Sequence, residues 1–215
     1  ASSFVIKYST IIMSISQISE TLFILAIPFS FKRFGIKQVM LISMVAWVFR
    51  FALFGFGDPA GGLWMIILSC IVYGMAFDFF NISGSLFVET TTEPKIRSSV
   101  QGLFMMMTNG FGAVLGSVVA GWSIDRFFTE KFTDIQSLAA KFDTTADNPT
   151  FLDIARNSLG AVINGDGSLA NPVNIKDWHQ IWIAFAVYAL IVAILFALLF
   201  KNEPKQDIDL SKMQH

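Results

Sequence analysis

Apolar residues are concentrated in four stretches within the first 123 residues and in one stretch near the end of the chain. Hydropathy searches for membrane helices usually average over windows of about 19 residues. Such windows place these stretches at residues 9–31, 38–56, 63–85, 101–123 and 181–200. The last one reads IWIAFAVYALIVAILFALLF and contains no charge, and its length suits a hydrocarbon core about 30 Å thick. Because a bilayer supplies no water to backbone groups, these spans should be helical. We therefore predict an all-α membrane protein with about five transmembrane helices.

The same pattern predicts four parts of the chain. Residues 1–123 hold four helices with short linkers, residues 124–177 form an extracytoplasmic loop rich in Asp, Asn, Thr and Gly, residues 178–200 hold the last helix, and residues 201–215 form a tail. Eight basic residues fall on one predicted side of the membrane: Lys32, Arg33, Lys37, Lys95, Arg97, Lys201, Lys205 and Lys212. Since basic loops stay in the cytoplasm, we expect the C-terminus to be cytoplasmic.

Composition and charge narrow the possible functions. Hydrophobic residues make up 54% of the chain and charged residues 14%, whereas soluble domains carry about 25% charged residues. The net charge of -1 argues against nucleic-acid binding. A single cysteine, Cys70, offers neither a disulfide nor a cysteine zinc site. Neither of the two histidines has a nucleophile at the spacing that a catalytic site would need. We therefore predict that the protein is not an enzyme and that it binds no metal and no cofactor.

Three charged residues lie inside predicted spans, namely Glu20, Arg50 and Asp78. Charges at this depth are costly and usually functional. Gln17 and Glu20 are three residues apart, which puts them on one helix face, and we expect that face to point into the bundle. Two interpretations of Glu20 stay open, a role in binding substrate or protons, and a structural ion pair, for instance with Arg50.

The third span carries a polar and aromatic stripe. Tyr73, Phe77 and Asn81 recur at intervals of four residues, which puts them on one face of a helix. Aromatic rings can stack on a flat ligand ring with little dependence on its identity. Ordinary packing is the alternative, because 14% of the chain is aromatic. In the fourth span, Asn109 either faces a cavity or bridges two helices.

The chain resembles bacterial nucleoside permeases of the nucleoside:proton symporter family in three segments: SQISETLFILAIPFSFKRFGIKQVMLISMVAWVFRFALFGFGDP, IVYGMAFDFFNISGSLFVE and IRSSVQGLFMMMTNGFGAVLG. The resemblance covers residues 16–121 and resumes at 177, so residues 124–177 are expected to be an insertion. It implies part of a twelve-helix major facilitator fold, with these five helices as the last five and the N-terminal half missing.

The resemblance also implies roles for individual residues. Gln17 and Glu20 would hydrogen-bond a nucleoside, and Tyr73 and Phe77 would line the site near its ring. Glu20 is the first candidate for proton coupling and Asp78 the second, while Arg50, Asn81 and Asn109 are weaker site candidates.

The expected function is proton-coupled import of nucleosides across the bacterial cytoplasmic membrane. The expected partners are nucleosides, protons, the lipid bilayer and the missing N-terminal half. Two alternatives stay open, a symporter for another small polar solute such as a sugar, and a membrane scaffold subunit that transports nothing.

Overall fold

The computed structural model describes residues 9–57 and 61–200 of the chain. The predicted cytoplasmic tail, with its three lysines, lies outside the described residues. The chain divides into two compact units, one made of residues 1–115 and 179–215 and the other of residues 116–178.

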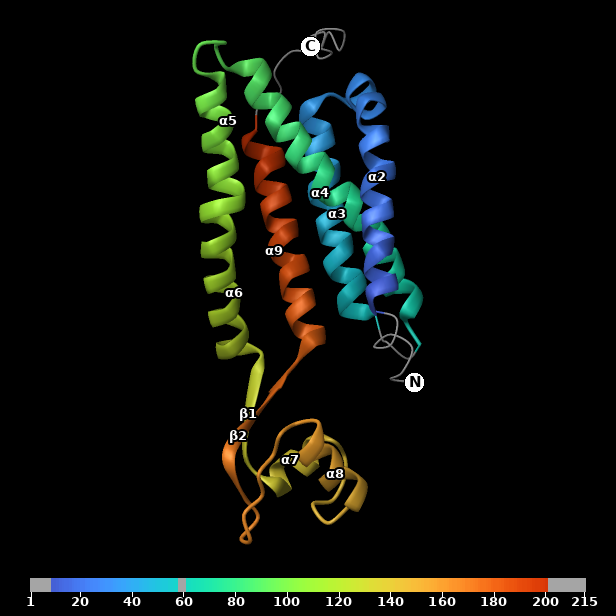
Figure 1. The fold of residues 1–215 in the computed structure, drawn as a ribbon, viewed down its shortest axis with the longest axis vertical. Coiled ribbons are helices and arrows are strands. Elements are labelled where there is room, and N and C mark those ends of the chain that lie inside the picture. The colour runs from blue at the N-terminus through green and yellow to red at the C-terminus, as the bar shows by residue number, and fades with distance from the viewer. Residues whose placement is uncertain (1–8, 58–60, 201–215) are drawn as a thin grey trace. The chain divides into compact units, whose positions relative to one another are not determined.

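The described part of the first unit consists of helices joined by short connections (Figure 1). It contains α2 (Ser9–Phe34), α3 (Ile36–Phe56), α4 (Leu63–Thr91), α5 (Arg97–Met105), the π-helix η1 (Met106–Gly112) and most of α9 (Trp178–Leu199). With α6 (Ala113–Phe127), which continues η1, these helices supply five candidate membrane spans in the described residues. The predicted number of transmembrane helices is confirmed. The third span runs farther than predicted, to Thr91 rather than to residue 85.

Small residues bring α2 and α4 into backbone contact. The Ser19 hydroxyl on α2 donates a 2.5 Å hydrogen bond to the Ile71 carbonyl on α4. A Cβ atom at Gly74 would lie only 2.5 Å from the backbone nitrogen of Glu20. In a bilayer, helices associate largely through such close packing and through hydrogen bonds between them. The contact therefore holds Glu20 close to the middle of α4.

Helix α9 packs along α3 at both of its ends. Near its start, the imidazole Nδ1 of His179 lies 2.6 Å from the Gly55 carbonyl oxygen. The Trp182 ring stacks against Phe54, with ring centroids 5.1 Å apart. At the opposite end, the Lys37 ammonium donates to the carbonyls at the end of α9. These contacts link two helices that are more than 120 residues apart in the sequence.

The fourth span is interrupted by the π-helix η1, which the sequence analysis did not predict. Its wider turn directs the Met107 carbonyl toward Gly112, where an added Cβ would lie 2.7 Å from that oxygen. A side chain at this position would clash, so glycine allows the turn to form here. Single π-helical turns occur often at functional sites.

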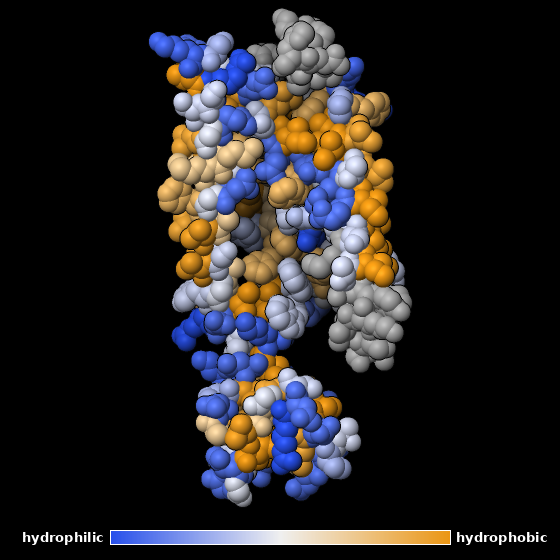
Figure 2. Space-filling view, in the orientation of Figure 1, coloured by the Kyte–Doolittle hydropathy of each residue, from blue (hydrophilic) through white to orange (hydrophobic). Residues whose placement is uncertain are grey.

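Large apolar side chains cover much of the surface of the first unit. Leu25 is 74% exposed and Leu198 is 76% exposed. Figure 2 shows apolar side chains along both flanks of the bundle and more polar ones between them. A soluble protein with this surface would aggregate, whereas hydrocarbon chains solvate it well.

The second unit contains a small folded module, the ribbon module (residues 129–176). Strand β1 (Thr129–Asp134) pairs antiparallel with β2 (Ser168–Lys176), and the register shifts between Phe132 and Asp134. Two short helices, α7 (Ile135–Lys141) and α8 (Pro149–Asn157), lie between the strands in sequence. The module has its own core of buried residues: Ile135, Leu138, Ala139, Phe151, Ala155, Ala161, Leu169 and Val173.

Polar side chains stabilise the turns of the ribbon module. Asp134 caps α7, because both the backbone nitrogen and the hydroxyl of Ser137 donate to its carboxylate at 2.7 Å. These hydrogen bonds hold the pKa of Asp134 below its ordinary value. Ser168 lowers the pKa of Asp166 in the same way. The segment predicted as a loop rich in Asp, Asn, Thr and Gly thus contains paired strands and a core of its own.

Candidate functional site

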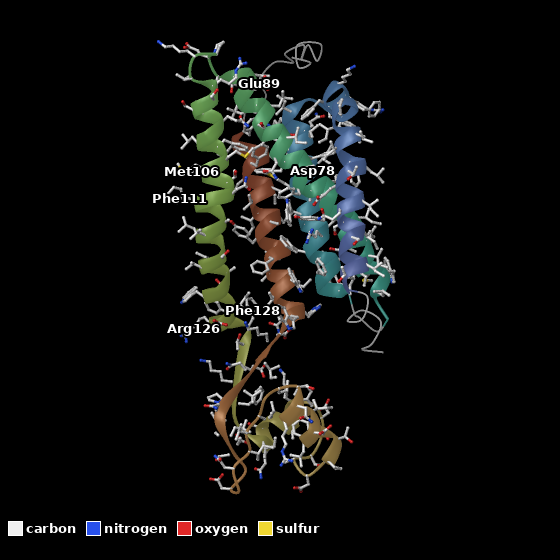
Figure 3. The ribbon with its side chains drawn as sticks, viewed as in Figure 1. Asp78, Glu89, Met106, Phe111, Arg126 and Phe128 are labelled. Carbon is white, nitrogen blue, oxygen red and sulfur yellow. The ribbon has the colours of Figure 1, made fainter. Side chains whose placement is uncertain are left out.

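Three helices of the first unit contribute the candidate site. Glu20 comes from α2, Arg50 from α3, and Tyr73, Phe77 and Asp78 from α4. The close contact at Gly74 puts the Glu20 backbone beside the residue that follows Tyr73. Figure 3 shows Asp78 near mid-length of the bundle. The site therefore lies deep within the predicted spans, where ionisable residues mark substrate and ion routes.

Arg50 lies within a cage of aromatic rings. Its guanidinium carbon is 3.9 Å from the centroid of the Tyr73 ring, 5.3 Å from that of Trp47 and 5.6 Å from that of Phe54. The Ser69 hydroxyl donates to the Arg50 backbone carbonyl at 3.2 Å and ties α4 to α3 beside it. Cation–π contacts of this kind stabilise by up to about 2 kcal/mol when desolvated. One terminal nitrogen of Arg50 is buried without a hydrogen-bond partner in the described part of the chain.

Tyr73 and Phe77 form a partly open aromatic surface. Their ring centroids are 5.7 Å apart with a tilt of 32°, and Trp47 meets Tyr73 edge-on at 5.9 Å. Phe77 is 38% exposed, whereas its neighbour Phe79 is 4% exposed and packs edge-on against Phe23. Phe79 is therefore a core residue, and Phe77 has a face available for a ligand.

Glu20 lies near the cation and near the second acidic candidate, Asp78. The charge of Glu20 acts on both Arg50 and Asp78. Asp78 is only 8% exposed, and one of its carboxylate oxygens has no hydrogen-bond partner among the residues described. Over residues 9–57 and 61–200, no ion pair within 4.0 Å joins Glu20 to Arg50. Glu20 is thus not held in the structural ion pair that was its alternative interpretation.

The weaker candidates are spread more widely. Gln17 is exposed, one turn before Glu20 on α2. The Asn81 amide donates to the Phe77 carbonyl at 3.0 Å, so this donor is occupied within α4. Asn109 lies in η1, where its amide nitrogen is 3.5 Å from the Met105 sulfur.

Sequence reasoning overlooked three residues that shape this site. Trp47 completes the aromatic cage, Ser69 ties α4 to α3, and Gly74 permits the α2–α4 contact. Trp47 lies one turn before Arg50, and Gly74 directly follows Tyr73. A helical-wheel comparison would have put Trp47 on the Arg50 face, but the partner helices could not be read from the sequence.

Fold and site together define a class of protein. The described residues contain five apolar helices long enough to cross a membrane, and three of them, α2, α3 and α4, carry a cation, two carboxylates and a partly exposed aromatic surface within their spans, as in a multi-pass membrane transporter. The chain belongs to the nucleoside H+ symporter family, whose model matches residues 1–146. This match continues past residue 123, where the insertion was expected to begin.

Curated relatives and solved structures agree with this family. The chain is 46% identical to "Nucleoside permease NupG" of Escherichia coli K12 and 44% identical to "Xanthosine permease" of the same organism, over 94% of this chain and 38% of each relative. It matches the crystal structure of nucleoside transporter NupG with a TM-score of 0.66 and 45% identity. It matches the crystal structure of an aspartate-to-alanine mutant of NupG with a TM-score of 0.68 and 44% identity. Both structural matches cover 94% of this chain and 40% of the solved chain.

These matches confirm the predicted fold class and the family resemblance. The chain is mostly helical apart from the β1–β2 pair and forms part of a major facilitator fold. It spans about two fifths of the length of the relatives it matches. Those relatives are named as permeases, which are transporters.

Proposed function

We propose that the full-length protein imports nucleosides together with protons, and that this chain supplies most of its C-terminal half. The observation that carries the proposal is the cage in which Arg50 lies 3.9 Å from the Tyr73 ring, beside Glu20 and the open face of Phe77. It provides stacking surface and a hydrogen-bonding carboxylate in one place. The family and the names of the relatives support the same substrate class.

Each candidate residue takes a role in this proposal. Tyr73 and Phe77 stack on the nucleobase, since base–aromatic stacking is worth about 1–3 kcal/mol and tolerates different bases. Gln17 and Glu20 hydrogen-bond the hydroxyls of the sugar. Asn81 and Asn109 are the weaker candidates for contact with the nucleoside.

Proton coupling is assigned first to Glu20 and second to Asp78. A carboxylate that can be reached from either side of the membrane in turn gains a proton on one side and releases it on the other. Arg50 attracts the charged form of Glu20, because opposite charges attract. Protonation of Glu20 weakens that attraction and so favours one of the two access states.

Transport itself follows alternating access. The two halves of the full-length protein rock about the central site, and nucleoside and proton enter from outside and leave into the cytoplasm. The proton gradient supplies the driving force, and no covalent chemistry takes place. In this proposal the protein lies in the bacterial cytoplasmic membrane with its C-terminus in the cytoplasm.

A competition experiment tests the substrate class. The full-length protein is reconstituted in proteoliposomes with an inward pH gradient, and uptake of labelled uridine is measured with excess adenosine, xanthosine or a disaccharide. We expect the nucleosides to compete and the disaccharide to have no effect. Uptake that is unchanged by every nucleoside, or that is blocked by the sugar, would refute the proposal and favour a symporter for another polar solute.

A further inference from the structure

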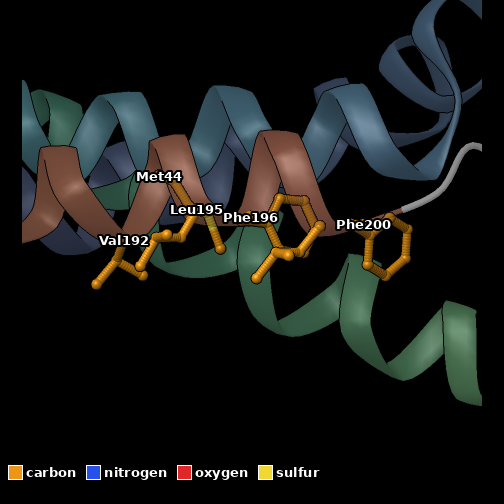
Figure 4. Close-up of a pocket in the computed structure, with 6 residues that line it drawn as sticks. Met44, Val192, Leu195, Phe196 and Phe200 are labelled. Carbon is orange, nitrogen blue, oxygen red and sulfur yellow. The ribbon is translucent and has the colours of Figure 1, made fainter.

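An open apolar groove runs along the side of α9 toward the end of that helix. It is about 340 Å³ in volume and is lined by Met44 of α3 together with Val192, Leu195, Phe196, Leu199 and Phe200 (Figure 4). Four of the lining residues lie in the last turns of α9 and Phe200 directly follows that helix, and all five follow helical spacing, so they share one face. All six side chains are apolar, and the groove suits a hydrocarbon chain.

The groove is separate from the candidate transport site. The site residues lie on α2, on α3 at Arg50 and on α4, whereas five of the six groove residues lie at the end of α9. Leu195 is 49% exposed and Leu199 is 76% exposed. From Val192 to Phe200 the helix rises by about 12 Å, which gives the groove enough length for part of an acyl chain.

A lysine lies at one end of this groove. The Lys37 ammonium donates to the backbone carbonyl of Ala197 at 3.3 Å and to that of Phe200, whose ring lines the groove. An ammonium group has three N–H donors. Two of them bond these carbonyls, so the third can bond an acceptor placed at the end of the groove.

The charges around Lys37 favour an anion. Lys32 and Arg33 lie in the last turn of α2, and only a short turn at Gly35 separates that helix from α3. Two acidic residues flank the end of α4: Glu89, which lies 3.8 Å from Arg97 and is partly neutralised by it, and Glu93, which precedes Lys95 in the linker to α5. Basic pockets between membrane helices commonly bind the head groups of anionic lipids.

We propose that the groove and Lys37 together bind an anionic phospholipid. Its acyl chain lies along Val192, Leu195 and Leu199, and its phosphate accepts a hydrogen bond from Lys37. The groove by itself gives little preference over bulk lipid, because lipid chains are as apolar as its walls. Selectivity for an anionic head group therefore comes from the lysine.

Native mass spectrometry of the full-length protein tests this site. The protein is purified in detergent, mixed with phosphatidylglycerol or phosphatidylcholine, and the bound fraction of each lipid is measured. We expect phosphatidylglycerol to bind more tightly, and Lys37→Gln to weaken it about five-fold, which corresponds to about 1 kcal/mol for one basic residue. Lys95→Gln, which removes a charge from the linker between α4 and α5, should leave binding unchanged.

A second variant separates the groove from the charge. Leu195→Trp fills the groove while leaving Lys37 in place, and we expect it to displace phosphatidylglycerol as well. Equal binding of the two lipids by the wild-type protein would overturn the proposal, as would undiminished phosphatidylglycerol binding in both variants. A second copy of the protein bound in place of lipid, seen as a dimer mass that Leu195→Trp abolishes, would also overturn it.

Discussion

Glu20 and Arg50 lie close enough to influence each other but make no direct ion pair in the described residues. In a low-dielectric region, a charge that lacks a fixed partner responds strongly to protonation of its neighbour. This spacing is suited to a group that must gain and lose a proton during each cycle. A tight ion pair would instead hold both charges in a single state.

Replacing Glu20 by glutamine tests this role directly. The amide keeps the shape and most hydrogen bonds of the carboxyl group but cannot release a proton. We expect Glu20→Gln to abolish uphill accumulation of nucleoside in proteoliposomes that contain the full-length protein. Exchange of internal for external nucleoside should continue, because it needs no net proton movement. Normal accumulation by a folded variant would remove Glu20 from the coupling mechanism.

Arg50 should affect substrate binding through the Tyr73 ring that it contacts. Loss of a desolvated cation–π contact costs about 2 kcal/mol, so Arg50→Gln should raise the half-saturation concentration for nucleoside by roughly thirty-fold if the whole loss falls on binding. Arg33 offers a matched control, because its guanidinium lies 5.6 Å from the Phe34 ring on an exposed turn. Arg33→Gln should leave uptake kinetics unchanged. An identical half-saturation concentration in Arg50→Gln would show that this contact does not position the ring.

At the scale of elements, the contact between α2 and α4 decides where Glu20 lies. Ser19, Glu20 and Gly74 form this contact without bulky side chains. Pairs of membrane helices commonly associate through small and polar residues rather than through large apolar side chains.

Adding one methyl group should disturb this contact. Gly74→Ala places a Cβ 2.5 Å from the Glu20 backbone nitrogen, and a backbone atom cannot move aside as a flexible side chain does. Overpacking of this kind costs roughly 1–3 kcal/mol, so we expect a lower melting temperature and weaker nucleoside binding in the full-length protein. Gly102→Ala, with nothing within 4 Å of its Cβ, is the control. Equal melting temperatures for the wild-type protein and Gly74→Ala would argue against the close approach.

The ribbon module should lose stability without loss of the helical unit. Leu138 is fully buried in the core of the module, and replacing a buried leucine by alanine costs about 2–5 kcal/mol. We expect Leu138→Ala to open the module to proteolysis while the membrane helices keep their melting temperature. Ile154→Ala, at a position that is 46% exposed, is the matched control. Simultaneous loss of both units would show that they unfold together.

At the scale of the whole molecule, the chain is much shorter than the transporters it resembles. It spans about two fifths of their length. The α6 part of the fourth span has no buried residue in the described structure. In a two-half transporter the substrate site lies between the halves, so the candidate residues here would form one side of it.

The 215-residue chain alone should therefore transport nothing. We expect proteoliposomes containing only this chain to show no uptake of labelled uridine above empty vesicles, while the full-length protein accumulates it. The Glu20→Gln variant serves as a transport-deficient control, because it has the same length as the full-length protein. Uridine accumulation by the short chain would mean that the site is complete within these five helices.

The sequence alone determined the membrane class, the number of spans and most of the candidate residues. Hydrophobic length reports directly on bilayer thickness, and a charge within such a span stands out without any knowledge of its neighbours. The family resemblance then assigned Gln17, Glu20, Tyr73 and Phe77, whose joint role in binding stays a prediction.

Only the tertiary structure decided which residues contact one another. The stacking of Arg50 on Tyr73, the approach of Gly74 to Glu20 and the partnership of β1 with β2 each join segments that are distant in sequence. The π-helical turn depends on a change of hydrogen-bond partner within one helix. Hydropathy and spacing describe one element at a time, whereas these features arise from the packing of one element on another or from local backbone geometry.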